Sequence, residues 1–202
     1  MFDLILRPAK ERLLSPAARA IGSSVSPLAV TLTAFVAGAG AALSAALGSY
    51  HLALVLWLLN RALDGLDGTL ARTQGRQSDA GGFVDIVLDF AVYAAIPIAL
   101  VAGQPGRATA MAGLTLLGSF YVNAASWMYL AAVLERRDAG ARARGELTSI
   151  VMPTGLMEGA ETVAFYSLFL VFHDRLVPLF AIMTVLVMLT VLQRIAWAMR
   201  VL

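Results

Sequence analysis

Long apolar stretches separated by short polar segments run along nearly the whole of this chain of 202 residues. Each stretch is about 20 residues long, the length that an α-helix needs to cross the hydrocarbon core of a bilayer. The pattern predicts helices over residues 26–47, 52–72, 81–102, 108–134, 149–172 and 176–199. We therefore expect an all-α integral membrane protein, with one domain over 1–202 and a bundle of six transmembrane helices over 26–200.

Residues 1–22 have a different pattern, in which apolar side chains such as Phe2 and Leu4 are mixed with basic ones such as Arg7 and Lys10. The apolar run is too short for the core of a signal peptide. A helix with one apolar and one basic face lies in the plane of the membrane surface. Residues 1–22 are therefore predicted to form an N-terminal amphipathic juxtamembrane helix, with a loosely ordered basic tail as the alternative.

The composition agrees with a membrane protein, since 59% of the residues are hydrophobic, 14% are charged and the mean hydropathy is +0.79. Cysteine is absent, which excludes disulfides and thiolate metal sites. The formal charge of +2 and the pI near 9.3 could indicate a nucleic-acid partner. The basic residues instead follow the ends of the predicted helices, so we expect no nucleic acid.

The lysines and arginines predict an orientation, because these residues gather on the cytoplasmic side of membrane proteins. With a cytoplasmic N-terminus, Arg107 and Arg175 fall in outer loops and Arg61 falls inside a predicted helix. The other twelve of the fifteen lie at or near cytoplasmic ends: Arg7, Lys10, Arg12, Arg19, Arg72, Arg76, Arg136, Arg137, Arg142, Arg144, Arg194 and Arg200. Both termini, and the candidate site of residues 60–89 described next, are therefore expected to face the cytoplasm, in a bacterial-type inner (cell) membrane.

Four aspartates stand in the second and third predicted helices, at a depth where carboxylates are costly and usually functional. Asp64 and Asp67 are three residues apart, and Asp85 and Asp89 are four apart, so each pair lies on one helix face. If the two faces meet, the carboxylates need a compensating cation, and an all-oxygen site suits Mg²⁺ or Mn²⁺. We predict a site for hard divalent metal, with two ions.

The spacing of this region resembles the signature of the CDP-alcohol phosphotransferase (CDP-alcohol phosphatidyltransferase) family. The resemblance rests on the pattern Asp64-x2-Asp67-Gly68-x2-Ala71-Arg72-x8-Gly81-x3-Asp85-x3-Asp89. It implies a six-helix membrane fold, a homodimer, and a role in phospholipid biosynthesis. The implied reaction transfers a phosphoalcohol group from a CDP-alcohol, typically CDP-diacylglycerol, to the hydroxyl of a small acceptor alcohol, and CMP leaves.

The resemblance also implies roles for single residues. Asp64 and Asp85 would bridge two metal ions, Asp67 would complete the first site, and Asp89 would complete the second and act as general base. The nucleotide or CDP-alcohol would lie against Ala29, Val30, Thr31, Leu32 and Ser78, of which the first four match only loosely. Gly68 leaves room for a ligand beside the helix backbone, and the guanidinium of Arg72 suits a diphosphate.

The motif does not define the acceptor, for which the other charges in the predicted helices are the best indication. Glu158, Glu161 and Arg61 either line the acceptor pocket, or Glu158 and Arg61 form an ion pair that neutralises both. Two carboxylates beside an acidic cluster would repel a phosphorylated acceptor. An unphosphorylated polyol or amino alcohol is therefore favoured.

A cation or proton-coupled transporter is the alternative function, because intramembrane carboxylates also line transport pathways. That reading accounts for the four aspartates but not for the spacing of Gly68, Ala71, Arg72 and Gly81. The enzyme is therefore the favoured interpretation.

Overall fold

The structure, a computed structural model, describes residues 14–22, 24–138, 140 and 155–202, and all of the regular secondary structure in these ranges is helical. Residues 14–21 are helical. The elements that follow are α2 (Pro27–Ala46), α3 (Tyr50–Thr73), α4 (Asp79–Gly103), α5 (Arg107–Arg136), α6 (Gly159–Val171), the short 3₁₀ helix η1 (His173–Arg175) and α7 (Leu176–Val201).

Five of the predicted helices are confirmed, with ends that differ from the predicted ones by about two residues at most. Local chemistry defines these ends. The Ser26 hydroxyl accepts a hydrogen bond from the backbone N–H of Ala29, and Pro27 occupies the first turn, where no backbone donor is needed. Gly48 follows α2 at a φ of +75°, a conformation that favours glycine.

The predicted helix over 149–172 is wrong at its start. Residues 149–154 lie outside the described residues, and residues 155–158 are not helical. The helix α6 begins at Gly159 and has 13 residues, about 20 Å at the usual rise, which is shorter than the hydrocarbon core. A capping box fixes this start, because the Glu158 side chain accepts from the α6 backbone and the Glu161 side chain accepts from the N–H of Glu158.

Four segments of the described chain are long and apolar enough to cross a membrane: α2, α4, α5, and η1 with α7. The helix α3 is long enough but carries Arg61, Asp64, Asp67 and Arg72, which lower its hydropathy. Residues 1–13 of the predicted juxtamembrane helix lie outside the described residues. Many large apolar side chains on the described helices are exposed, as expected for surfaces that face lipid.

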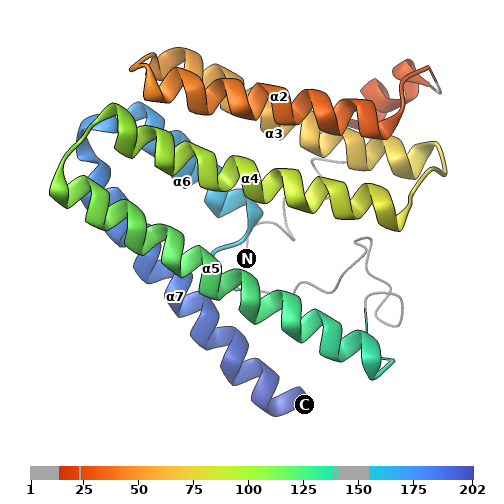
Figure 1. Cartoon of the computed structure of the whole chain (residues 1–202). Helices are drawn as coiled ribbons and strands as arrows, with labels where there is room; N and C mark the ends of the chain where they lie inside the picture. Colours follow the sequence, from red (N-terminus) through yellow and green to blue (C-terminus); the bar gives the residue numbers. More distant parts are fainter. Residues whose placement is uncertain (1–13, 23, 139, 141–154) are drawn as a thin grey trace.

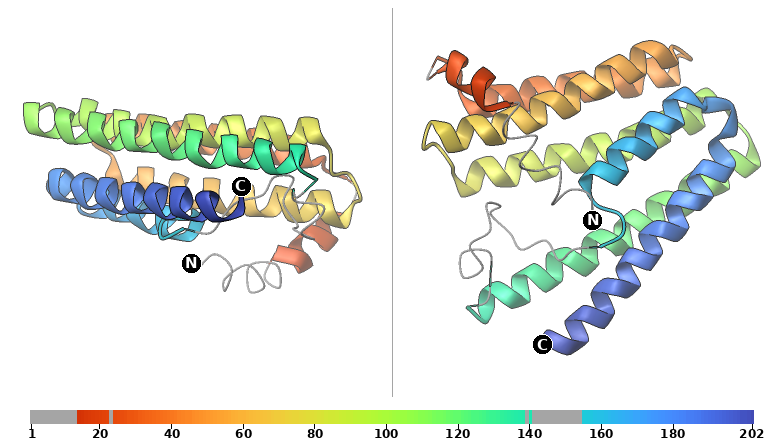
Figure 2. Two further views of the ribbon diagram at one scale, coloured as in Figure 1. Left: turned by 90° about the horizontal axis from the view of Figure 1, so that it is seen from below. Right: turned by 180° about the vertical axis from the view of Figure 1, so that it is seen from behind.

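The helices form two groups that meet at one end (Figures 1 and 2). In the first group α2 packs against both α3 and α4, and in the second α5 packs along α7. The short helix α6 contacts α3 and α7 and so links the groups. The groups lie close where α4 turns into α5 and diverge toward the end where α3 finishes and α4 begins.

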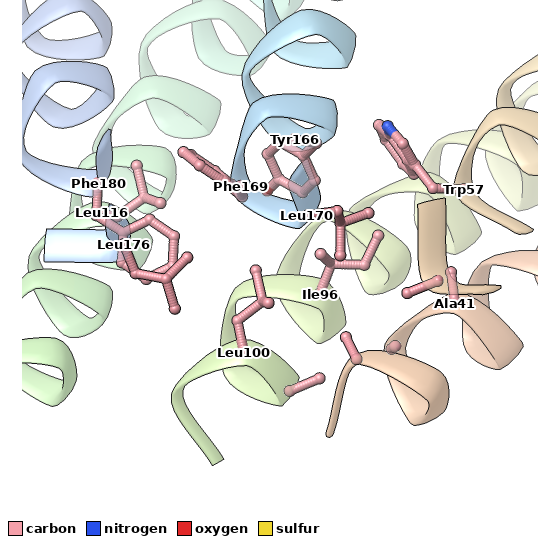
Figure 3. Packing of buried hydrophobic residues seen from close by; sticks show 14 of the residues in the cluster. Ala41, Trp57, Ile96, Leu100, Leu116, Tyr166, Phe169, Leu170, Leu176 and Phe180 are labelled. Carbon is pink, nitrogen blue, oxygen red and sulfur yellow. The ribbon is translucent and has the colours of Figure 1, made fainter. Parts of the chain in front are cut away.

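Aromatic side chains fill the space between α3, α4 and α6 (Figure 3). Trp57 and Tyr166 stack with ring centroids 5.1 Å apart, and Tyr93 meets both rings edge-on. All of these rings lie within or against the main hydrophobic core. The core therefore begins directly beside the residues that carry the acidic motif.

The helix α4 contains Pro97, which has no N–H to donate to the carbonyl oxygen of Tyr93 one turn earlier. The Tyr166 hydroxyl donates to that oxygen at 2.6 Å and replaces the missing hydrogen bond. Pro97 thus leaves the carbonyl oxygen of Tyr93 free to accept a hydrogen bond. The hydrogen bond from Tyr166 to this oxygen joins α6 to α4.

Candidate active site

Three of the four predicted metal ligands converge. Asp64 comes from α3 and Asp85 and Asp89 from α4, and one carboxylate oxygen of each lies within 4.8 Å of the other two. Oxygen ligands on opposite sides of a bound Mg²⁺ ion stand about 4.2 Å apart. The three side chains could therefore hold a hard divalent cation if their oxygens draw closer together around it.

Asp67 lies outside that group of three. Its side chain is buried, and one carboxylate oxygen accepts a hydrogen bond from the Thr31 hydroxyl at 2.6 Å. Thr31 belongs to α2, so this contact ties the second aspartate of the motif to a neighbouring helix. The role of Asp67 as a metal ligand stays a prediction.

Arg61, for which an acceptor-pocket role and an ion pair with Glu158 were both open, pairs with the acidic cluster. Its guanidinium donates to both oxygens of Asp89, at 2.6 Å and 3.2 Å, and lies 3.8 Å from an oxygen of Asp64. Glu158 is not among its partners, so the predicted ion pair between Arg61 and Glu158 is wrong. The start of α6 explains this, because Glu158 caps that helix and its Oε1 accepts from the N–H of Gly155 at 2.8 Å.

A small pocket is lined by the carboxylates of Asp64, Asp85 and Asp89, and Thr31 and Asn60 also line it. Of the stretch predicted to contact the nucleotide, only Thr31 reaches this pocket. Val30 is buried against Ala18 and Leu70 in a separate apolar cluster. The other two residues, Ala29 and Leu32, are exposed.

Gly68 and Arg72 lie one turn apart near the end of α3. Among the described residues, a Cβ on Gly68 would meet only the Arg72 guanidinium, at 3.4 Å, which leaves space for a ligand beside this glycine. The Arg72 guanidinium donates to the Thr69 hydroxyl at 3.2 Å. The predicted contacts of Gly68 and Arg72 with a diphosphate stay predictions.

Ser78 is the N-cap of α4, and its hydroxyl accepts from the backbone N–H of Gly81 at 3.1 Å. This hydrogen bond positions the helix that carries Asp85 and Asp89. Contact of the same hydroxyl with a nucleotide stays a prediction. A substitution at Ser78 can distinguish that contact from the capping role.

Replacing Ser78 with alanine removes the cap and is expected to lower the stability of the protein by about 1 kcal/mol. Ser78→Asp keeps an acceptor at the N-cap and should retain that stability. Thermal unfolding of both variants measures the cap. If Ser78 also contacts the nucleotide, Ser78→Asp should raise the KM for the CDP-alcohol because it adds negative charge, and an unchanged KM would limit Ser78 to capping.

The predictions from sequence missed the residues that hold Arg61. Asn60 accepts from the Arg61 Nε at 2.7 Å, and the Tyr93 hydroxyl accepts from its guanidinium at 2.9 Å. The guanidinium carbon lies 4.9 Å from the ring centroids of both Trp57 and Tyr93. The signal was present, because Trp57 lies four residues before Arg61 and Tyr93 four residues after Asp89, on the same helix faces.

Converging carboxylates on two helices of an apolar bundle are typical of an integral membrane protein with a site for hard divalent metal. Residues 24–192 match the model of the CDP-alcohol phosphatidyltransferase family. The chain belongs to this family. It is a CDP-alcohol phosphotransferase, and the transporter alternative does not apply.

Curated relatives agree with this assignment. The chain is 38% identical over 169 residues to the inner membrane protein YnjF of Escherichia coli, a match that covers 83% of this chain and 81% of the relative. It is also 33% identical over 127 residues to a bifunctional IPC transferase and DIPP synthase of Archaeoglobus fulgidus, but that match spans only 26% of the relative and 63% of this chain.

The fold is similar to that of a phosphatidylinositol phosphate synthase from Mycobacterium tuberculosis with CDP-DAG bound. The TM-score is 0.71 at 19% identity, with 93% of this chain and 94% of that chain covered. A structure of the same enzyme with manganese and citrate gives a TM-score of 0.69 at 21% identity, with 92% and 88% covered. At these identities the likeness concerns the fold alone.

Proposed function

We propose that this protein transfers a phosphatidyl group from CDP-diacylglycerol to the hydroxyl of a small alcohol. The observation that carries the proposal is the convergence of carboxylate oxygens from Asp64, Asp85 and Asp89 within 4.8 Å, in a member of this family. The similar synthase with CDP-DAG bound, and its structure with manganese and citrate, support the choice of donor and of metal.

Two divalent cations, Mg²⁺ or Mn²⁺, would be held by the four aspartates and would neutralise the diphosphate and the leaving phosphate. The acceptor oxygen forms a bond to the phosphorus that carries diacylglycerol, the bond from that phosphorus to the bridging oxygen breaks, and CMP leaves. Asp89 takes the proton of the hydroxyl. Its carboxylate has about four acceptor positions, and Arg61 uses two of them. Thr31, Arg72 and Ser78 are proposed to contact the nucleotide side of the donor.

In the proposed topology the chain crosses the membrane six times. The four apolar segments, α3 and the segment that ends with α6 form these spans, and a juxtamembrane helix precedes them. Counted from Arg72 at about 1.5 Å per residue, Asp64 lies roughly 12 Å along α3 from its cytoplasmic end. A soluble nucleotide can reach that depth while the lipid tails stay in the bilayer. The relative in Escherichia coli supports an inner-membrane location. The homodimer implied by the resemblance stays a proposal.

The acceptor is proposed to be an unphosphorylated polyol or amino alcohol, since the carboxylates of Asp64, Asp85 and Asp89 converge at the proposed reacting position. Arg61, a cation of the described chain beside this position, already binds Asp89. Purified protein with CDP-diacylglycerol and Mg²⁺ should therefore release CMP faster with inositol than with inositol phosphate, and faster with glycerol than with glycerol phosphate. A phosphorylated partner that is preferred in both pairs would contradict the acceptor but not the donor.

Chelation of divalent metal should stop CMP release in these assays, and added Mg²⁺ or Mn²⁺ should restore it. Glu158→Gln tests whether the carboxylate also serves the acceptor, because glutamine keeps an oxygen for capping α6 and loses the charge. A changed preference among the alcohols would place Glu158 in the acceptor pocket. An unchanged preference would limit it to capping.

A further inference from the structure

Arg61 makes hydrogen bonds, ion pairs and ring contacts in the acidic region of the described chain. Its side chain is 9% exposed and lies between α3 and α4. Each of its three nitrogens donates: Nε to Asn60, and the two terminal nitrogens to Asp89, with one of them also donating to the Tyr93 hydroxyl. Hydrogen bonds from all three of its nitrogens hold the guanidinium in one orientation.

The platform beneath Arg61 is fixed as well. Trp57 and Tyr93 each present a ring 4.9 Å from the guanidinium carbon, a distance at which a cation is attracted to the ring face. Tyr93 is held through its own backbone, because the carbonyl freed by Pro97 accepts from the Tyr166 hydroxyl. Trp57, labelled with Tyr166 in Figure 3, stacks on that tyrosine. One buried tyrosine therefore contacts the rings of both Trp57 and Tyr93.

Two consequences follow for the acidic site. A planar guanidinium that grips both oxygens of a carboxylate prevents it from rotating, so Asp89 is held in one orientation. A fixed positive charge this close also offsets part of the negative charge of Asp64, Asp85 and Asp89, and so lowers the attraction of the site for a cation. An arginine that only stabilised the fold would not need to bind both oxygens of one carboxylate. Nor would that carboxylate need to belong to the proposed metal site.

We propose that Arg61 is a positioning residue that fixes Asp89 for proton transfer and sets the affinity of the acidic cluster for divalent metal. The inference rests on the proposed function, since it assigns Arg61 a task in that same site. It separates two properties that side-chain substitutions can change independently, the charge of Arg61 and its bidentate geometry.

Three variants separate these properties: Arg61→Gln, Arg61→Lys and Tyr93→Phe, with Arg175→Gln as the exposed control. Arg61→Gln should bind Mn²⁺ about tenfold or more tightly, since a nearby positive charge is gone, and should release CMP at least tenfold more slowly. Arg61→Lys should keep the wild-type Mn²⁺ affinity but share the slow turnover, because an ammonium cannot grip both oxygens. Tyr93→Phe should leave the affinity unchanged and lower turnover several-fold.

Free Mn²⁺ is measured by electron paramagnetic resonance on purified full-length protein, and CMP release is measured on the same samples. Arg61→Gln with unchanged or weaker Mn²⁺ binding, or Arg61→Lys with wild-type turnover, would overturn the proposal. If Arg61→Gln does not fold, the Mn²⁺ affinity and turnover of Arg61→Lys and Tyr93→Phe test the proposal. If the wild-type protein binds no Mn²⁺, the proposed function itself is overturned. If the wild-type protein binds Mn²⁺ and the Arg61 variants have the same affinity and turnover as the wild type, only this inference is overturned.

Discussion

Replacing Asp85 with asparagine is expected to reduce CMP release by about two to three orders of magnitude, since metal ligation contributes several kcal/mol and each 1.36 kcal/mol is tenfold. Asp85 is the member of the cluster from α4 that we expect to be shared by two ions. Asparagine has nearly the same size, so the packing of α4 should be preserved. Initial rates at saturating CDP-diacylglycerol and Mg²⁺ measure the effect.

The matched control is Asp79→Asn, the same change at an exposed aspartate on the first turn of the same helix. It should change the rate less than twofold, because it removes only a charge near the helix end. Weaker Mn²⁺ binding by Asp85→Asn should accompany its slow turnover. Equal rates for the two variants would remove Asp85 from the site.

Replacing Gly38 with alanine is expected to destabilise the protein by about 1–3 kcal/mol, the usual cost of overpacking a core. A Cβ at this position would lie 2.6 Å and 2.8 Å from the two methyl groups of Val92, and 3.0 Å from the Asn60 amide. To make room, α2 must move away from α3 and α4, which carry the carboxylates. Turnover should therefore fall together with stability.

Gly118→Ala is the matched control, because no atom of the part of the chain that the structure describes lies within 4 Å of the added Cβ on the exposed side of α5. It should leave the melting temperature unchanged or raise it slightly. Gly38→Ala should lower that temperature by several degrees, at roughly 2–4 °C per kcal/mol for a chain of this size. A melting temperature for Gly38→Ala equal to that of Gly118→Ala would contradict the close approach of α2 to α4.

The sequence predicted the helices well where a long apolar run ends at clear breaking residues. Ser26 with Pro27, and Gly48, mark the ends of α2 in the sequence as they do in the structure. Helical periodicity placed Asp85 and Asp89 on one face of α4, and Asp64 of α3 meets them as expected, whereas Asp67, predicted on the same face as Asp64, lies outside the group.

The start of α6 was not predicted, because hydrophobicity was given more weight than local signals. Gly155 precedes the helix, and Glu158 and Glu161 stand three residues apart, as in a capping box. The usual pattern has serine or threonine at the first position, so glutamate there was read as a pocket residue. The partner of Arg61 was missed for another reason: helix periodicity gives a face but not which charges on neighbouring helices meet.

The division of the bundle has a consequence for how such an enzyme diversifies. The acidic cluster and its arginine come from α3 and α4, which α2 holds together, whereas α5 and α7 pack mainly on each other. Apart from positions such as Trp127, whose ring lies 6.3 Å from that of Phe90 beside Asp89, most of the α5–α7 pair can therefore change in sequence without direct contact with the acidic cluster. We expect relatives to differ more along that pair than along α3 and α4.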